Sequence, residues 1–401
     1  MTEEIRADAD RQRGGAVPRR GRWKRWAPLA ANLALAALAT GLTLAAAEIA
    51  FRVALFQFEG EAFFATQRKP GLYADYSSHD AYWKLQYRWQ KRYPPPDDPH
   101  PLLGWAAGFD RTTYLHDEAH ALAGRRPVLL YGDSFAQGVP GVPRFQEILG
   151  ARSSFAHEHQ LLNYGVGGYG LDQIVLLMEQ SLDLYDDPFV VLSFMLYDLD
   201  RSVLSVRTGQ KPYFDLVDGE LELRNVPIPP DPHRFFAENS PRIASYLWRR
   251  FLYRTHQPPN LVIARLRGEK PKRRHKERLN GAILERALVA IEARDLDAAI
   301  VVFHPQAFLA GYPDWRDGWL RARLADVEIP VLWSNEVLRR GAPEAELFDL
   351  VIKGNGHPTA LSNRLIADEI ERWVAASRSS ERQPAPAERS TKKMTTPVTD
   401  T

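Results

Sequence analysis

The chain contains no cysteine among its 401 residues. This absence excludes disulfide frameworks, thiolate zinc sites and a cysteine nucleophile. It does not fix the compartment, because a chain without cysteine is compatible with an oxidising space as well as with the cytosol. Nucleophilic catalysis, if present, must therefore use another side chain, such as a serine hydroxyl.

The chain also lacks a large excess of charge of either sign. Its 52 basic and 50 acidic residues leave a formal net charge of +2, so no field of the whole protein argues for nucleic acid, and we expect no such partner. Apolar residues make up 45% and charged residues 25% of the chain. This composition excludes a wholly disordered, a collagen-like or a polytopic membrane protein.

Long apolar runs are absent except for one near the start. Residues 27–47 read APLAANLALAALATGLTLAAA and hold no charge. At about 1.5 Å per residue, such a helix covers roughly 30 Å, the hydrocarbon thickness of a bilayer. Basic residues and tryptophans precede the run; clustered Lys and Arg stay on the cytoplasmic side, and Trp favours the membrane interface. They are Arg19, Arg20, Arg22, Trp23, Lys24, Arg25 and Trp26. The rival interpretation, a cleaved secretory signal, usually has a shorter apolar region of about 7–15 residues.

We therefore expect one uncleaved span in inner-membrane lipid, with the N-terminus in the cytoplasm and the rest of the chain in the periplasm. The end of the chain is rich in Ser, Thr, Pro and Ala and cannot offset the entropy of ordering. The expected parts are a cytoplasmic basic tail (1–26), a transmembrane anchor (27–49), a connecting region (50–125), one α/β domain (126–375) with an insertion at about 203–275, and a disordered tail (376–401).

From residue 126 onward, short apolar runs alternate with amphipathic stretches. Continuous apolar strands separated by helices are typical of a parallel sheet covered on both faces, and such sheets bind ligands outside the C-terminal ends of their strands. The expected strands are 127–131, 161–164, 189–196, 298–303 and 330–333, and the expected helices lie around 143–152, 171–183, 277–294, 315–325 and 358–376.

The segment 203–275 departs from this alternation, and we interpret it as an insertion able to cover the site. It contains an expected hairpin that turns at Asp218–Gly219, followed by a helical stretch around 233–255. The basic run EKPKRRHKER (269–278) is interpreted as a solvated, mobile surface segment, with an anion-binding patch as the alternative.

Three blocks carry side chains suited to acyl chemistry. Ser134 follows the first strand, where the turn into a helix places a hydroxyl near backbone amides that can receive an oxyanion. A glycine cluster at 165–170 follows the second strand; it suits close approach of a ligand to the backbone, or merely a tight turn. His357 precedes the last helix, and an imidazole can take a serine proton and return it.

Read in order, G-D-S, N-x-G-x-G-G and x-G-H-P-T resemble the SGNH/GDSL hydrolase superfamily over about residues 126–375. The resemblance implies a three-layer α/β/α, flavodoxin-like fold that works without a cofactor. It also implies that Ser134 is the nucleophile, that His357 is the base, and that the N–H groups of Ser134 and Gly168 form part of the oxyanion hole.

Two blocks depart from the family's pattern. After the third strand the family has Asn-Asp, whereas this chain has Tyr197-Asp198, so a tyrosine stands in place of the oxyanion asparagine and Asp198 lies beside it. Before His357 the expected acid is replaced by Asn355 or Gly354. An asparagine can orient an imidazole but cannot balance its charge; a backbone carbonyl or Asp349 is the alternative partner.

Further residues allow two interpretations each. His116 and His120 have the spacing of metal ligands on a helix but lack a third ligand, so we expect no metal. His304 follows the fourth strand and either contacts substrate or ends the strand. Aromatic residues between 72 and 93 form a sugar-stacking surface or pack the connecting region. They are Tyr73, Tyr76, Tyr82, Trp83, Tyr87, Trp89 and Tyr93.

Taken together, the sequence favours a membrane-anchored, extracytoplasmic serine esterase, deacetylase or O-acyltransferase. Its expected substrates are acyl esters of cell-surface glycans, and its expected partners are membrane proteins that modify polysaccharides. The alternative is an inactive glycan-binding or scaffold protein of the same fold, which the altered Tyr197 and Asn355 favour.

Overall fold

The computed structural model describes residues 21–58, 65–90, 94–253 and 269–381. The chain divides into two compact units, residues 1–73 with 243–255 and residues 74–242 with 256–401. The expected N-terminal tail up to residue 20 and the expected C-terminal tail from residue 382 lie outside the described residues. The last helix continues to Glu381, several residues beyond the expected end of the domain.

The first unit is built on α1 (Gly21–Phe56). Among the described residues, α1 is the one helix long and apolar enough to cross a membrane, over Pro28–Phe56. A short 3-10 turn, η1 (Pro70–Leu72), and the helix α10 (Tyr246–Tyr253) belong to the same unit. The Glu48 carboxylate accepts hydrogen bonds from the backbone N–H groups of Tyr246 and Leu247 at 2.9 and 3.0 Å. An acidic side chain of α1 thus caps the start of a helix almost 200 residues away.

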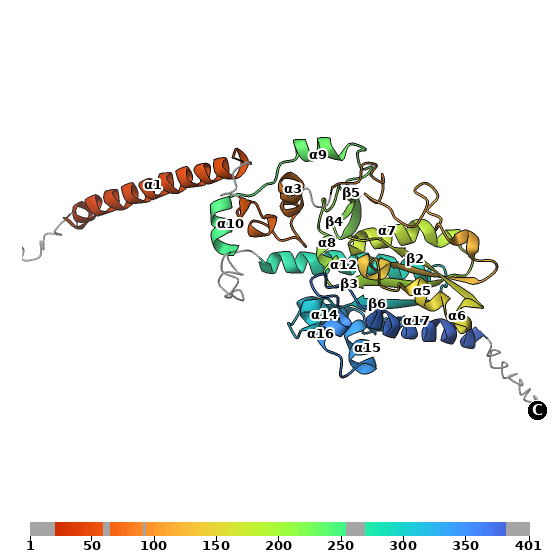
Figure 1. Cartoon of the computed structure of the whole chain (residues 1–401). Helices are drawn as coiled ribbons and strands as arrows, with labels where there is room; N and C mark the ends of the chain where they lie inside the picture. Colours follow the sequence, from red (N-terminus) through yellow and green to blue (C-terminus); the bar gives the residue numbers. More distant parts are fainter. Residues whose placement is uncertain (1–20, 59–64, 91–93, 254–268, 382–401) are drawn as a thin grey trace, which may run out of the picture. The chain divides into compact units, whose positions relative to one another are not determined.

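The second unit contains a five-stranded parallel sheet (Figure 1). The strands follow the order β2-β1-β3-β6-β7, which is the flavodoxin-like order of doubly wound sheets. Each apolar run expected to be a strand is one, so the predicted parallel α/β architecture is confirmed. The strands are β1 (Arg126–Gly132), β2 (His159–Gly165), β3 (Phe189–Met195), β6 (Ala298–Phe303) and β7 (Val331–Trp333).

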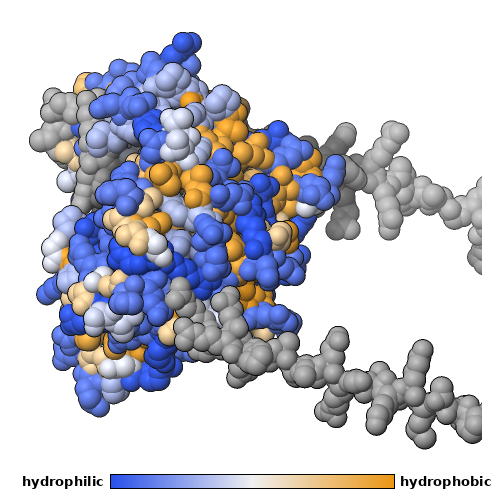
Figure 2. Space-filling model, turned by 90° about the vertical axis from the view of Figure 1, so that its right-hand side faces the viewer, coloured by the Kyte–Doolittle hydropathy of each residue, from blue (hydrophilic) through white to orange (hydrophobic). Residues whose placement is uncertain are grey.

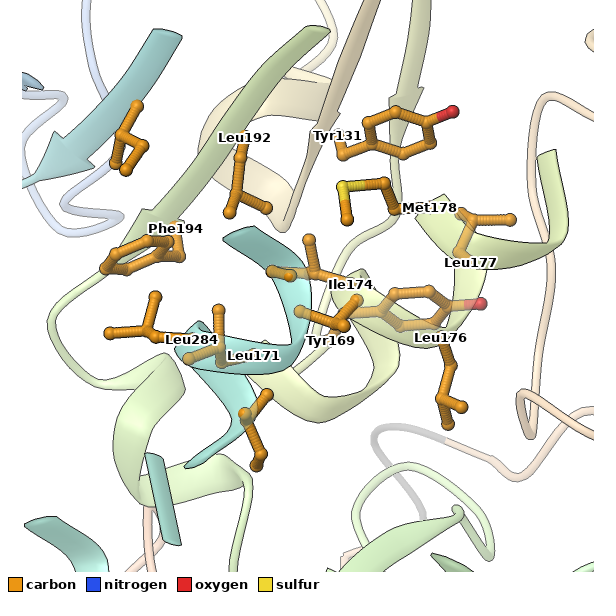
Figure 3. Close-up of a cluster of buried hydrophobic side chains, with 14 of the residues drawn as sticks. Tyr131, Tyr169, Leu171, Ile174, Leu176, Leu177, Met178, Leu192, Phe194 and Leu284 are labelled. Atoms are coloured by element: carbon orange, nitrogen blue, oxygen red, sulfur yellow. The ribbon is translucent and has the colours of Figure 1, made fainter. Parts of the chain in front are cut away.

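Alternate residues of the strands face two separate cores, which makes the three-layer α/β/α arrangement. On β1, Leu129 and Tyr131 face one core and Val128 and Leu130 face the other. The first core packs against α7 and α12 (Figure 3), and the second packs against α5, α6, α15 and α17. These helices are α5 (Phe145–Gly150), α6 (Ser153–Ala156), α7 (Leu171–Ser181), α12 (Glu269–Glu292), α15 (Ser334–Gly341) and α17 (Ala360–Glu381).

The segment from residue 74 to the first strand belongs to the same unit as the sheet. Leu103 and Phe109 of this segment are buried in the first core.

Hydrophilic residues cover most of the face of the molecule shown in Figure 2. Short elements complete the unit: α3 (Asp80–Trp89), η2 (Ala119–Ala121), η3 (Leu182–Leu184) and α14 (Trp315–Arg323).

The insertion contains the predicted hairpin, but its helical part differs from the prediction. The strands β4 (Tyr213–Val217) and β5 (Glu220–Arg224) turn at Asp218–Gly219, both with positive φ, as the Asp-Gly pair predicts. The single helical stretch expected over 233–255 is wrong: α9 (Pro232–Glu238) ends before Pro241, whose ring cannot continue a helix, and α10 is separate. The basic run 269–278 forms the first turns of α12, and Arg273, Arg274 and His275 are exposed, as expected of a solvated surface segment.

Candidate active site

Ser134 begins α4 (Ser134–Gln137) directly after β1, at the C-terminal edge of the sheet. The Oδ1 atom of Asp133 accepts a hydrogen bond from Phe135 N at 2.8 Å and so caps this short helix. A Cβ on Gly132 would lie 2.3 Å from Ser193 Oγ, so the turn leaves no room for a side chain. The G-D-S block therefore forms a tight strand-to-helix turn that presents the serine at the point where the strand order reverses.

His357 is paired with this serine. Its Nε2 atom lies 2.9 Å from Ser134 Oγ, although the two residues are 223 positions apart. The histidine lies in the loop between α16 (Leu347–Leu350) and α17. The distance is that of a hydrogen bond between a nucleophile and its general base.

Asn355 sets the tautomer of His357. The Asn355 Oδ1 atom accepts the backbone N–H of His357 at 3.2 Å and also contacts His357 Nδ1. Because an oxygen faces Nδ1, that nitrogen carries the hydrogen and Nε2 is left to accept the Ser134 proton. The carboxylate of Asp349 instead accepts from Glu346 N at 2.9 Å and caps α16, so it does not orient the imidazole.

Burial lowers the pKa of His357, which keeps the ring neutral near neutral pH. The nearby negative charge of Asp133 acts in the opposite direction and favours the protonated ring. Asp133 is fully buried. The two tasks of a triad acid are thus divided, because Asn355 orients the base and Asp133 supplies a negative charge.

Two backbone N–H groups lie free beside the nucleophile. Within the described ranges, the N–H groups of Ser134 and Gly168 donate to no other residue. The glycine turn adjoins the serine, since a Cβ built on Gly167 would lie 3.8 Å from Ser134 Cβ. Gly168 has φ of +91°, a conformation that favours glycine. Two unpaired donors beside a serine hydroxyl are the arrangement that receives a developing oxyanion.

Ser134 and His357 line one cavity of about 600 Å³, whereas Gly168 is not among its lining residues. Four of the predicted site residues line it, namely Ser134, Tyr197, Asn355 and His357. Burial raises the pKa of Tyr197, so its hydroxyl stays protonated and able to donate. The remaining lining residues are Tyr76, Phe135, Met195, Arg201, Arg207, Pro305, Gln306, Ala307, Ala310, Tyr312 and Gly356; Gln306 and Ala307 begin α13 (Gln306–Leu309).

The structure does not bring Asp198 into the cavity. Asp198 is fully buried in α8 (Asp198–Arg201), where its Oδ2 atom accepts from Met195 N at 2.8 Å and its Oδ1 atom pairs with Arg201. Arg201 also donates to Asp133 Oδ2 at 2.8 Å. The two aspartates therefore hold the guanidinium beside the nucleophile, and Asp198 acts through it rather than on a substrate.

Sequence reasoning missed Arg201, Arg207 and Tyr312, and it singled out Tyr76 only as one of a run of aromatics. Of that run, Tyr76 lines the cavity, whereas Trp83 is buried and Tyr87 stacks on Phe236 at a centroid distance of 4.2 Å. Tyr93 lies outside the described residues. The run of aromatic residues, through Tyr76, was the only feature of the sequence that indicated this part of the cavity lining.

The other histidines of interest have structural partners. His304 is buried; its Nε2 atom donates to Asp317 Oδ1 at 2.9 Å, and its Nδ1 atom lies 3.0 Å from Ser334 Oγ. It ends a strand and does not line the cavity. The rings of His116 and His120 bond separate backbone carbonyls, those of Asn163 and Asp117, at 3.2 and 2.9 Å.

No protein-family profile and no curated protein matches the chain, but solved structures do. A member of the lipolytic protein G-D-S-L family from Veillonella parvula is 13% identical with a TM-score of 0.33, and the match covers 62% of this chain and 97% of that one. An α/β hydrolase enzyme from the metagenome of Lake Arreo, Spain, is also 13% identical with a TM-score of 0.33, over 63% and 96% of the two chains.

These similarities are too low to support an argument. The comparison with a family therefore uses the sequence and the structure of this chain alone. The strand order is flavodoxin-like, the three sequence blocks meet at one edge of the sheet, and the serine contacts the histidine. In its fold, its sequence blocks and the geometry of its site, this chain resembles the SGNH/GDSL hydrolase superfamily.

Proposed function

We propose that the chain is a serine ester hydrolase of SGNH type. The observation that carries this proposal is the 2.9 Å contact between Ser134 Oγ and His357 Nε2, beside two backbone N–H groups free to receive an oxyanion. In this proposal Ser134 Oγ bonds to the ester carbonyl carbon while its proton passes to His357 Nε2. The carbonyl oxygen takes up the negative charge and accepts from the N–H groups of Ser134 and Gly168.

Collapse of this intermediate breaks the ester C–O bond. The imidazolium of His357 gives its proton to the departing alkoxide, which leaves as the alcohol. Water then attacks the acyl-serine with His357 as the base, and the acid and free Ser134 are released. No further reactant is needed for this cycle.

The acyl acceptor and the substrate decide whether the chain hydrolyses or transfers acyl groups. A sugar hydroxyl in place of water would make the same acyl-serine an O-acyltransferase intermediate, and acyl esters of cell-surface glycans would be the substrates. Three tyrosines of the cavity lining, Tyr76, Tyr197 and Tyr312, support this proposal because flat aromatic faces pack well against sugar rings. Membrane proteins that modify polysaccharides would be the natural partners.

We also propose that α1 anchors the chain in the cytoplasmic membrane with the α/β unit in the periplasm. The large apolar side chains from Leu29 to Ile49 are exposed, as Leu35 and Leu42 illustrate. A bilayer would remove this surface from water. The basic residues before the helix favour a cytoplasmic N-terminus.

The altered Asn355 also supports a second candidate, a glycan-binding protein without activity. A fluorophosphonate that cannot cross membranes separates the two and tests the topology, because it labels only an activated serine that it can reach. On spheroplasts that produce the full chain, we expect labelling of the wild type, loss of labelling in Ser134→Ala, and the same labelling before and after lysis.

The matched control is Ser154→Ala, which removes an exposed serine hydroxyl bonded to Glu371, away from the cavity, and should keep the label. A wild-type chain that is folded but never labelled would contradict the hydrolase proposal. Labelling that appears only after lysis would overturn the periplasmic orientation. Transfer and hydrolysis are then separated by whether an acetyl group from a chromogenic ester reaches an oligosaccharide faster than water.

A further inference from the structure

The charged side chains that line the active-site cavity are basic. Of the described residues in the lining, Arg201 and Arg207 carry guanidinium groups and none carries a carboxylate. Arg201 is neutralised from behind by Asp133 and Asp198. Arg207, in contrast, pairs directly with no carboxylate among the described residues, and Asp133 and Asp198 act on it only through their charge.

Arg207 has contacts but no hydrogen-bonding partner for its guanidinium among the described residues. A Cβ built on Gly168 would lie 1.7 Å from its Nη1 atom, so the guanidinium rests directly against that glycine. Its Cζ atom lies 5.1 Å from the centre of the Trp83 ring, and its buried Nε atom has no acceptor. An aromatic face attracts a cation but does not satisfy five N–H donors.

This arrangement is costly without a ligand. Burial lowers the pKa of Arg207 to about 9, which leaves the group charged at neutral pH. A buried guanidinium without acceptors for its N–H groups destabilises the fold, and the oxygens of an anion in the cavity would supply those acceptors. The planar fork of a guanidinium fits the oxygens of a carboxylate or a phosphate in a bidentate manner.

We propose that Arg207 forms an anion-binding subsite inside the active-site cavity, so that the preferred ester carries an anionic oxygen group, a carboxylate or a phosphate, close to its scissile bond. The proposal rests on the proposed hydrolase function and adds a substrate class to it. The free guanidinium and the Ser134–His357 pair share one cavity of about 600 Å³, so a single small ester can reach both.

The kinetic test uses the full chain in detergent and three esters with the same leaving group. These are mono-4-nitrophenyl succinate, its neutral methyl ester, and the 3-phosphonopropionyl analogue. For Arg207→Met we expect kcat/KM on the favoured anionic ester to fall roughly 10- to 100-fold, mainly through KM, since hydrogen bonds to charged groups are worth about 1.5–3 kcal/mol. On the neutral ester we expect a change of less than about threefold. The two anionic esters show whether the carboxylate or the phosphonate is preferred.

Two further variants make the result specific. Arg207→Lys keeps the charge but loses the planar guanidinium, so we expect an intermediate loss of kcat/KM on the anionic esters. This variant also keeps the proposal testable if Arg207→Met fails to fold. The control is Arg273→Met, because Arg273 also lies over an aromatic ring, that of Trp315 at 4.8 Å, but pairs with Glu277 outside the cavity. We expect the control to leave all three esters unaffected.

Binding without turnover separates this proposal from the hydrolase proposal. Calorimetry on Ser134→Ala with monomethyl succinate and monomethyl 3-phosphonopropionate should show uptake of at least one of them that the additional Arg207→Met change abolishes. That result would support the subsite even if the wild type hydrolysed nothing. An equal fall in kcat on neutral and anionic esters would mean that Arg207 contacts the reaction oxyanion instead. No effect on any ester or on binding would mean that Arg207 only packs against its neighbours. Either result would overturn the proposed subsite.

Discussion

At the scale of single residues, the site differs from a serine triad in one atom. Asn355 presents an amide oxygen to His357 where a carboxylate oxygen would carry charge. Replacing a triad acid by an amide costs about 10⁴ in turnover when the amide imposes the wrong tautomer. Here the amide oxygen faces Nδ1, so the tautomer is the productive one, but this partner carries no charge and the nearby negative charge is that of Asp133.

This difference predicts the behaviour of two variants at position 355. In Asn355→Asp the new negative charge should stabilise the imidazolium, so the acid limb of the pH–rate profile moves to higher pH and kcat rises. In Asn355→Ala the ring loses its orienting acceptor, and kcat should fall by roughly 10- to 100-fold, as expected for a misplaced catalytic group. The measurement is kcat and kcat/KM on a neutral ester from pH 5 to 9. An acid limb that stays in place in Asn355→Asp would show that Asn355 does not act on His357.

At the scale of elements, a buried ion pair ties the insertion to the sheet's helical layer. Lys211, just before β4, and Asp172, in the first turn of α7, are both fully buried and paired with each other. Lys211 Nζ also donates to the carbonyls of Leu204 and Pro212 at 3.1 and 2.8 Å. All three ammonium donors are therefore satisfied, which is what a buried lysine requires.

Breaking this pair from one side should be far worse than replacing both partners. Lys211→Met leaves the Asp172 carboxylate buried without a counter-ion, and we expect the free energy of unfolding of the α/β unit to fall by about 3–5 kcal/mol. The double change Lys211→Met with Asp172→Asn should recover part of that loss. Urea unfolding of the full chain in micelles, followed by near-UV circular dichroism, measures both.

The control is Arg234→Ala, which breaks the exposed pair of Arg234 with Glu238 and should leave the unfolding midpoint unchanged. If Lys211→Met unfolded at the same urea concentration as the wild type, the buried pair would not hold the insertion in place.

The elements were predictable where one local pattern sufficed. Apolar runs such as 189–196 indicated buried strands, and the blocks around Ser134 and His357 lay at strand and helix ends that a parallel sheet brings to one edge. Arg207 could not be predicted, because it reaches the glycine turn from an insertion about 40 residues further along the chain. Asp198 was expected at the substrate, but the short helix α8 turns it inward onto Arg201, and spacing alone does not encode that direction.

At the scale of the whole molecule, histidines couple the fold to pH. Burial lowers the pKa of His100, His116, His304 and His357. They lie in different parts of the α/β unit: before the sheet, after β6 and before α17. Each is held neutral in the folded state, so its protonation opposes folding.

The sign of the effect follows from linkage. Below about pH 6.5, the ordinary pKa of histidine, the unfolded chain binds more protons than the folded one, so the free energy of unfolding falls as the pH falls. Above that pH these four groups are neutral in both states and contribute no slope. The loss deepens until the pH passes the lowered pKa values of the folded state, where the folded chain begins to bind the same protons.

We therefore expect the Tm of the α/β unit to be flat between pH 7 and 8 and to fall between pH 6.5 and 5. Carboxyl groups act in two ways. Burial raises the pKa of Glu371, but hydrogen bonds from Ser154 and Arg152 outweigh it and lower that pKa, so the contribution of Glu371 is lost only below its ordinary range. Burial raises the pKa of Asp172 and Asp198, so these two groups favour folding as the pH falls and oppose the slope of the histidines. Differential scanning calorimetry of the full chain in micelles at constant ionic strength measures the profile, and His116→Gln, which removes one titrating ring, should flatten it. A Tm that is constant from pH 8 to 5, or that falls equally in His116→Gln, would contradict the assignment of the slope to buried neutral histidines.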